Sequence, residues 1–174
     1  MLKQDAMNTL FANTAKIFIS HAKILNQMEK QMKLNGGKIG PECVLSSVPL
    51  LLETENDYKE YVLKQESCVS KLKELLKNKK FAGIFEDICG SKQTGTAGKG
   101  VNVLDLEFQS FSISPIQRFP RYVLLFDSVL KNLSKEDPHH KQILIARQKM
   151  DKFCKSVNAH RANVKEPEKN LHHH

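Results

Sequence analysis

Arg118 and Arg121 are the residues whose type and spacing most suggest a chemical role. No arginine precedes Arg118, although lysine is frequent along the whole chain. A guanidinium group differs from an ammonium group by its rigid, planar fork of donors. Two arginines three residues apart, after a stretch that uses only lysine, therefore indicate a site that needs guanidinium geometry.

The residues around these arginines predict the helix that carries them. Ser114 suits the N-cap position and Pro115 the first helical position, where its missing N–H would have no helical partner. Gln117 stands three residues after Ser114 and completes a capping box. Pro120 lies deeper, where it should remove one backbone hydrogen bond and kink the first turns.

The helix then becomes apolar on every side, which predicts that it lies inside a bundle. We expect Tyr122, Leu124 and Leu125 to be core residues, and Arg118 to connect this helix to a neighbouring one. Gln117 and Arg121 are four residues apart and therefore share one face of the helix. Polar groups on a buried helix need partners, either from neighbouring helices or from another protein.

Composition and hydrophobic periodicity predict a single all-α domain. A chain of 174 residues with 40% apolar and 26% charged residues is typical of one soluble globular domain. Phe11, Phe18, Leu25 and Met32 recur every seven residues and predict one long amphipathic helix over 5–33. Further helices are expected over 42–53, 58–79, 81–89, 102–113 and 115–133, followed by a last helix after Asp137 and Pro138.

Several function classes are disfavoured by the sequence. The four cysteines are scattered, so neither zinc binding nor a redox motif is expected, and no covalent catalytic motif is present. The glycine-rich stretch over 90–100 does not match a phosphate-binding loop, because Lys99 is followed by glycine. We therefore expect no metal and no cofactor, and we interpret His172, His173 and His174 as the remnant of a tag.

The formal net charge of +8 could favour nucleic acid or an anionic membrane. The lysines are spread out, however, and no aromatic residues alternate with them as a base-stacking surface requires. We expect no nucleic-acid partner and a mostly solvated lysine face. The chain carries no signal peptide and no long apolar run, so a cytoplasmic protein is expected, and transient association with anionic membrane stays open.

The run from Pro115 to Lys131 resembles the third conserved region of the Dbl-homology domain, the exchange module of Rho-family guanine-nucleotide exchange factors. Pro-Ile-Gln-Arg-Phe-Pro-Arg-Tyr-Val-Leu-Leu-Phe matches the pattern of that region at almost every position. The residues from Leu10 to His21 also resemble the second region. The resemblance implies an elongated, all-α Dbl-homology bundle over residues 1–165, with residues 166–174 as a tail.

The same resemblance implies how the chain would act. A Rho-family exchange factor stabilises the nucleotide-free GTPase and forms no covalent bond, so it is not an enzyme in the usual sense. Arg121 matches the second basic position, which faces the GTPase switch region in the family, and Asn158 matches an asparagine that contacts switch II in family members. Gln117 would support them. The alternative is a non-catalytic helical module that binds a GTPase or a scaffold without releasing nucleotide.

One part of the family pattern does not match. Family members begin with an earlier helix whose glutamate contacts the GTPase, whereas this sequence starts just before the second region. Without that helix, part of the apolar seam formed by Phe11, Phe18, Leu25 and Met32 would be exposed. Burying such side chains contributes about 1.5–3 kcal/mol each. We therefore expect the seam to be covered by a second copy of the chain or by another segment.

Overall fold

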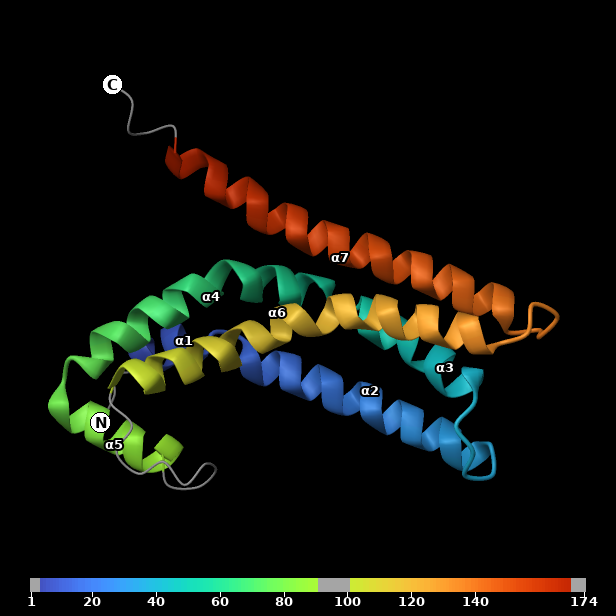
Figure 1. The fold of residues 1–174 in the computed structure, drawn as a ribbon, viewed down its shortest axis with the longest axis horizontal. Coiled ribbons are helices and arrows are strands. Elements are labelled where there is room, and N and C mark those ends of the chain that lie inside the picture. The colour runs from blue at the N-terminus through green and yellow to red at the C-terminus, as the bar shows by residue number, and fades with distance from the viewer. Residues whose placement is uncertain (1–3, 91–100, 170–174) are drawn as a thin grey trace. The chain divides into compact units, whose positions relative to one another are not determined.

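The computed structural model describes the backbone of residues 4–90 and 101–169, and within these ranges every regular element is a helix. Of the glycine-rich stretch predicted over 90–100, Gly90 is the last residue of a helix, and residues 91–100 lie outside the described residues, as do the three terminal histidines. The helices are, in order, α1 (Gln4–Phe11), α2 (Thr14–Leu34), α3 (Pro41–Leu52), α4 (Glu55–Leu76), α5 (Lys79–Gly90), α6 (Val101–Asn132) and α7 (His140–Lys169) (Figure 1). The all-α prediction is confirmed.

The chain divides into two compact units. Unit 1 comprises Met1–Ala12 and Lys64–Pro115, and unit 2 comprises Asn13–Leu63 and Ile116–His174. Helices α4 and α6 each contribute one part to unit 1 and the other part to unit 2. All of the predicted binding residues belong to unit 2.

Each unit has its own apolar core. In unit 1, Leu10 of α1 and Leu72 and Leu76 of α4 are buried together, with Phe85 and Phe108 packed against them. In unit 2, the core is a group of three aromatic rings, Tyr58, Phe119 and Phe153, which pack edge to face. The remaining fully buried side chains of α7 extend this core: Ile143, Met150 and Val157.

The predicted helix over 5–33 is interrupted, and this prediction is therefore wrong in its register. Ala12 has a left-handed φ of 48° and ends α1, and Asn13 then donates from Nδ2 to the backbone oxygen of Asp57 at 2.8 Å. The predicted seam is consequently not the core: Phe11, Phe18 and Leu25 are exposed, and Met32 is partly buried. The buried residues stand one position earlier: Leu10, Ile17 and Ile24.

The helix start predicted at Ser114 is also wrong, because α6 continues from Val101 to Asn132 through both Pro115 and Pro120. The Ser114 hydroxyl donates to the backbone oxygen of Ser110 at 2.9 Å, which is a bond made inside a helix, and Ser114 does not act as an N-cap. Ser112 before this point and Ile116 and Phe119 after it are buried, at spacings of four and three residues that place them on one face. Tertiary packing thus outweighs the cost of the prolines.

Another predicted boundary is confirmed. Helix α2 ends at Leu34 with Asn35 as its C-cap, and Gly36 and Gly37 follow with φ values of 66° and 79°. Glycine adopts this left-handed conformation without a Cβ penalty, and the Gly37 N–H donates to the oxygen of Met32 at 3.0 Å. The start predicted at Asp137 and Pro138 is two residues early, because α7 begins at His140; the Asp137 carboxylate accepts the backbone N–H of His139 at 2.8 Å in the turn before the helix.

Candidate functional site

The exposed face of α6 in unit 2 carries both predicted binding residues of this helix. Gln117 and Arg121 are one turn apart and are both exposed. Because Ser114 is not an N-cap, Gln117 has no capping role and its side chain is available. The helix therefore presents an amide and a guanidinium group side by side to the solvent.

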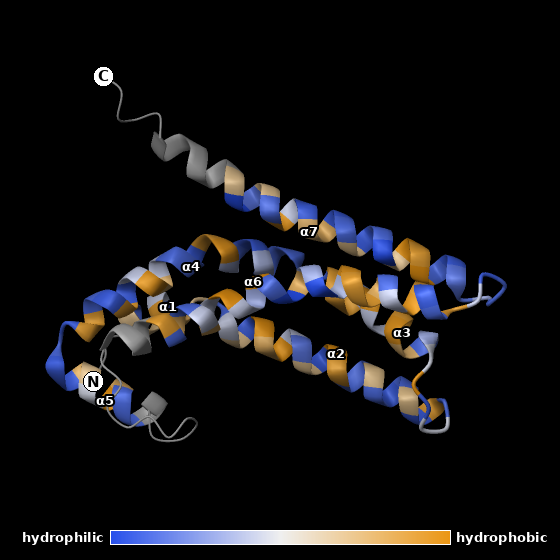
Figure 2. Cartoon of the chain, viewed as in Figure 1, coloured by the Kyte–Doolittle hydropathy of each residue, from blue (hydrophilic) through white to orange (hydrophobic). Residues whose placement is uncertain are grey.

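Leu124 and Leu125 lie on the exposed side of α6 as well, which corrects the prediction that they are core residues. Leu124 is 67% exposed and Leu125 is 59% exposed, and Tyr122 is only partly buried. The buried face is occupied instead by Ile116, Phe119 and Phe126. An α-helix packed against neighbours on one side can bury only one stripe, so an apolar run of five residues must expose some of its members. In Figure 2, the hydropathy colours of α6 alternate along the part that ends in Asn132.

Arg121 is chemically available in a way that the other arginines of unit 2 are not. Arg147 forms an ion pair with Asp127, with 2.9 Å between Nε and Oδ1, and Arg118 donates to the hydroxyl of Tyr122. Within the part of the chain that the structure describes, no hydrogen bond or ion pair engages the side chain of Arg121. Its cation can therefore bind an external acidic or carbonyl group without first breaking an internal bond.

Asn158 stands on a different helix. It is exposed on α7, directly after the fully buried Val157. Helix α7 contacts α6 one turn earlier, where the Cys154 thiol lies 3.6 Å from the backbone oxygen of Phe119. The structure thus brings Gln117 and Arg121 together on one face, whereas no bond among the described residues joins Asn158 to them.

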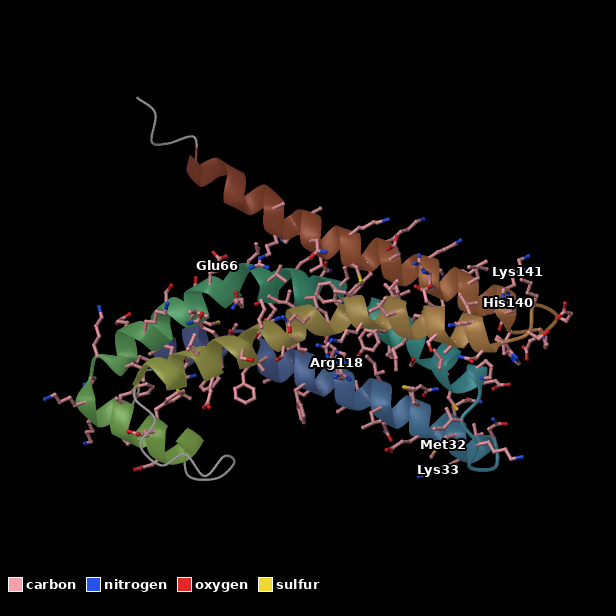
Figure 3. All side chains as sticks on the ribbon, in the orientation of Figure 1. Met32, Lys33, Glu66, Arg118, His140 and Lys141 are labelled. Atoms are coloured by element: carbon pink, nitrogen blue, oxygen red, sulfur yellow. The ribbon has the colours of Figure 1, made fainter. Side chains whose placement is uncertain are left out.

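A polar cluster behind this face was missed by the sequence analysis, which gave His21 no role of its own. His21 of α2 lies between Tyr58 of α4 and Tyr122 of α6, with 2.7 Å from Nε2 to the Tyr58 hydroxyl and 3.3 Å from Nδ1 to the Tyr122 hydroxyl. Arg118 completes the cluster, since its Nε donates to the Tyr122 hydroxyl at 3.0 Å. Figure 3 labels Arg118 on α6 beside α2.

One signal in the sequence could have placed His21 in this cluster. It stands four residues after Ile17 and three before Ile24, which puts it on the face that α2 buries. Burial lowers the pKa of His21, and the positive charge of Arg118 lowers it further. Burial also raises the pKa of Tyr58 strongly, so this hydroxyl keeps its proton. The cluster is therefore neutral except for Arg118.

The rest of the described chain offers no other obvious chemical site. Among the residues that the structure describes, no group of three or more potential metal ligands is found. None of the helices in this part of the chain is both long and apolar enough to span a membrane. The exposed face of α6 with Gln117 and Arg121 and the cluster behind it are the features that require a functional explanation.

Comparison with known proteins identifies the family. The model of the RhoGEF domain matches residues 1–158. Guanine exchange factor for Rac 30 from Dictyostelium discoideum is 28% identical over 160 residues, which cover 90% of this chain and 9% of that protein. Rac guanine nucleotide exchange factor JJ of the same organism is 24% identical over 164 residues, covering 94% of this chain and 13% of that protein.

A mammalian relative gives the same picture. FYVE, RhoGEF and PH domain-containing protein 4 from Mus musculus is 29% identical over 138 residues, which cover 77% of this chain and 16% of that protein. The chain thus spans only a small share of the curated relatives it matches. The match of the family model over most of the chain shows that this chain belongs to the RhoGEF domain family, which confirms the Dbl-homology resemblance.

Proposed function

We propose that this chain accelerates GDP release from a Rho-family GTPase by binding the nucleotide-free state more tightly than the loaded state. The observation that carries the proposal is the unpaired Arg121 on an exposed face of α6 within a RhoGEF domain. Two relatives carry Rac in their names, so a Rac-type GTPase is the first substrate to test.

The mechanism needs no covalent step. A protein that binds two states of its partner with unequal affinity shifts the partner toward the preferred state. Here Arg121 would pair with a GTPase group that becomes accessible once the nucleotide leaves, and Gln117 would add a hydrogen bond on the same face. Leu124 and Leu125 supply apolar area beside the arginine, and Asn158 on α7 would make a separate polar contact.

Release of a fluorescent GDP analogue from a panel of Rho-family GTPases tests this proposal. We expect faster release with at least one member, beginning with a Rac-type GTPase, and a slower rate when Arg121 is replaced by alanine. Acceleration that is unchanged in Arg121→Ala would remove this residue from the mechanism. No acceleration with any member of the panel would contradict the proposed function itself.

The alternative is a non-catalytic module that binds a GTPase or a scaffold through the same face. Equal affinity for two states cannot shift their equilibrium. Calorimetric titration of nucleotide-free and GDP-loaded GTPase distinguishes the two functions: unequal affinity in favour of the nucleotide-free form supports exchange, whereas equal affinities support the binding module.

Two further partners belong to the proposal. The exposed lysines of α7, among them Lys141, Lys149 and Lys152, would attract anionic lipid near a membrane-bound GTPase. Vesicles containing phosphatidylserine should then bind the chain in a salt-sensitive manner.

The exposed Phe18 and Leu25 on α2 would be covered by a second copy of the chain or by another segment. Light scattering tests whether a second copy covers them.

A further inference from the structure

The polar cluster of His21, Tyr58, Tyr122 and Arg118 joins three helices of unit 2 at one point. His21 comes from α2, Tyr58 from α4, and Tyr122 and Arg118 from α6. The His21 and Tyr122 rings are stacked with an interplanar angle of 8°, and the Arg118 guanidinium lies 5.7 Å from the centre of the Tyr122 ring. His21 on α2 thus helps to fix the position of the two consecutive turns of α6 that carry Arg118 and Tyr122.

The burial of the two tyrosine hydroxyl groups indicates which nitrogen of His21 carries the proton. The Tyr58 side chain is fully buried, so its hydroxyl proton needs an acceptor, and Nε2 of His21 at 2.7 Å is the atom that can accept it. The proton of the neutral imidazole is then on Nδ1 and is donated to the Tyr122 oxygen, which also accepts the Arg118 N–H. The Tyr122 hydroxyl proton can reach solvent because this residue is only partly buried.

We propose that neutral His21 is a positioning residue for the interaction face of α6, holding the Arg118–Tyr122 turn so that Gln117 and Arg121 keep their orientation. This inference rests on the proposed exchange function. Gln117 and Arg121 directly precede the two α6 residues that the cluster holds, namely Arg118 and Tyr122. A change at His21 is therefore transmitted to the face through one helical turn.

Protonation of His21 should disrupt the cluster. Protonation of Nε2 would turn this atom from an acceptor into a donor, so the buried Tyr58 hydroxyl proton would lose its acceptor. The new positive charge on the imidazole would also be repelled by the Arg118 guanidinium. The groups that face His21 from the surrounding helices are Tyr58 on α4 and Tyr122 and Arg118 on α6. The Asp57 carboxylate, next to Tyr58 in the sequence, pairs with Lys16 at 2.7 Å and so does not offset the repulsion at His21.

Exchange measured as a function of pH tests the proposal in the variant His21→Gln, with His140→Gln as the matched control. Rates are divided by the spontaneous release rate of the GTPase at each pH. We expect wild type and His140→Gln to lose activity as pH falls below 6.5, the ordinary imidazole value. We expect exchange by His21→Gln to be slower by about three- to tenfold at neutral pH and not to fall further as the pH is lowered below 6.5. A fall in exchange rate at low pH that persists in His21→Gln would overturn the proposal.

NMR separates failure of this inference from failure of the proposed function. Imidazole nitrogen shifts of the isolated chain should show His21 protonated at Nδ1, with a pKa below 6.5, whether or not any GTPase responds. The variant Tyr122→Phe keeps the ring and removes only the oxygen that accepts both N–H groups. It should abolish the protected Arg118 Nε signal and slow exchange while the free energy of unfolding changes little. Full exchange activity in Tyr122→Phe would contradict the positioning role.

Discussion

The rings of Phe119 and Phe153 pack edge to face with their centres 5.7 Å apart, and this contact joins α6 to α7 inside unit 2. Both rings also contact Tyr58, at 5.2 Å and 5.9 Å between centres. Aromatic pairs of this geometry add to the free energy gained by burial alone. The helices that carry Arg121 and Asn158 are thus held together by the same core contact.

Replacement of Phe119 by alanine should therefore destabilise the domain severely. Phe119 is 0% exposed, and truncation of a buried phenylalanine costs about 3–5 kcal/mol in the free energy of unfolding. Phe18→Ala is the matched control, because Phe18 is 72% exposed and its truncation should change that free energy by less than about 0.5 kcal/mol. Urea denaturation followed by circular dichroism measures both, and similar losses in the two variants would contradict the assigned register of α2.

Replacement of Arg121 by alanine should impair exchange without affecting the fold. Arg121 makes no internal bond among the described residues, so the midpoint of thermal unfolding should stay unchanged. A central arginine of an interface commonly accounts for a tenfold effect or more, so we expect exchange to slow by about tenfold. Arg121→Lys should recover only part of the rate, because lysine lacks the planar fork. The control is Arg147→Ala, which should exchange as fast as wild type.

Leu124→Ala separates an interaction residue from a core residue. Leu124 is 67% exposed, so its truncation should leave the free energy of unfolding within about 0.5 kcal/mol of wild type while weakening GTPase binding. Leu72 in unit 1 is 0% exposed, and Leu72→Ala should cost about 2–5 kcal/mol. Thermal unfolding and calorimetric binding distinguish them. A large decrease in the free energy of unfolding of Leu124→Ala would show that this leucine is a core residue.

The thiol of Cys154 should be unreactive in the native protein. Burial raises its pKa to about 11, and the nearby Asp151 carboxylate contributes. Because the thiolate is the reactive form, alkylation by iodoacetamide at pH 8 should label Cys154 only after unfolding in guanidinium chloride. Peptide mass spectrometry reads this site individually. Cys43 and Cys68 are also buried and should behave alike, and rapid native labelling of Cys154 would show that α6 and α7 separate in solution.

The sequence predicts the helices, the family and the shared face of Gln117 and Arg121 well, because all three depend on short-range spacing. It fails where tertiary packing decides. The heptad of Phe11, Phe18 and Leu25 indicated a core seam, but the buried stripe lies one residue earlier on both sides of the break at Ala12. Periodicity alone cannot distinguish two apolar stripes that lie side by side on one helix.

The prediction for α6 failed for a related reason. Ser114 and Pro115 fit a helix start locally, yet the helix continues through them, and Ser112, Ile116 and Phe119 are buried along it. Leu124 and Leu125 looked like core residues because an apolar run does not reveal how many neighbours surround it. Their exposure is informative, since costly apolar surface retained beside Arg121 is typical of a binding face.

The division of the chain into units has a consequence for biosynthesis. Unit 2 is assembled from Asn13–Leu63 and Ile116–His174, and the whole second stretch of unit 1 is inserted between them. While the ribosome makes Lys64–Pro115, the first half of unit 2 has already emerged but lacks the helices that will cover Tyr58. Its apolar side chains stay uncovered until Ile116–His174 has been synthesised, so we expect the nascent chain to expose more apolar surface than the finished domain.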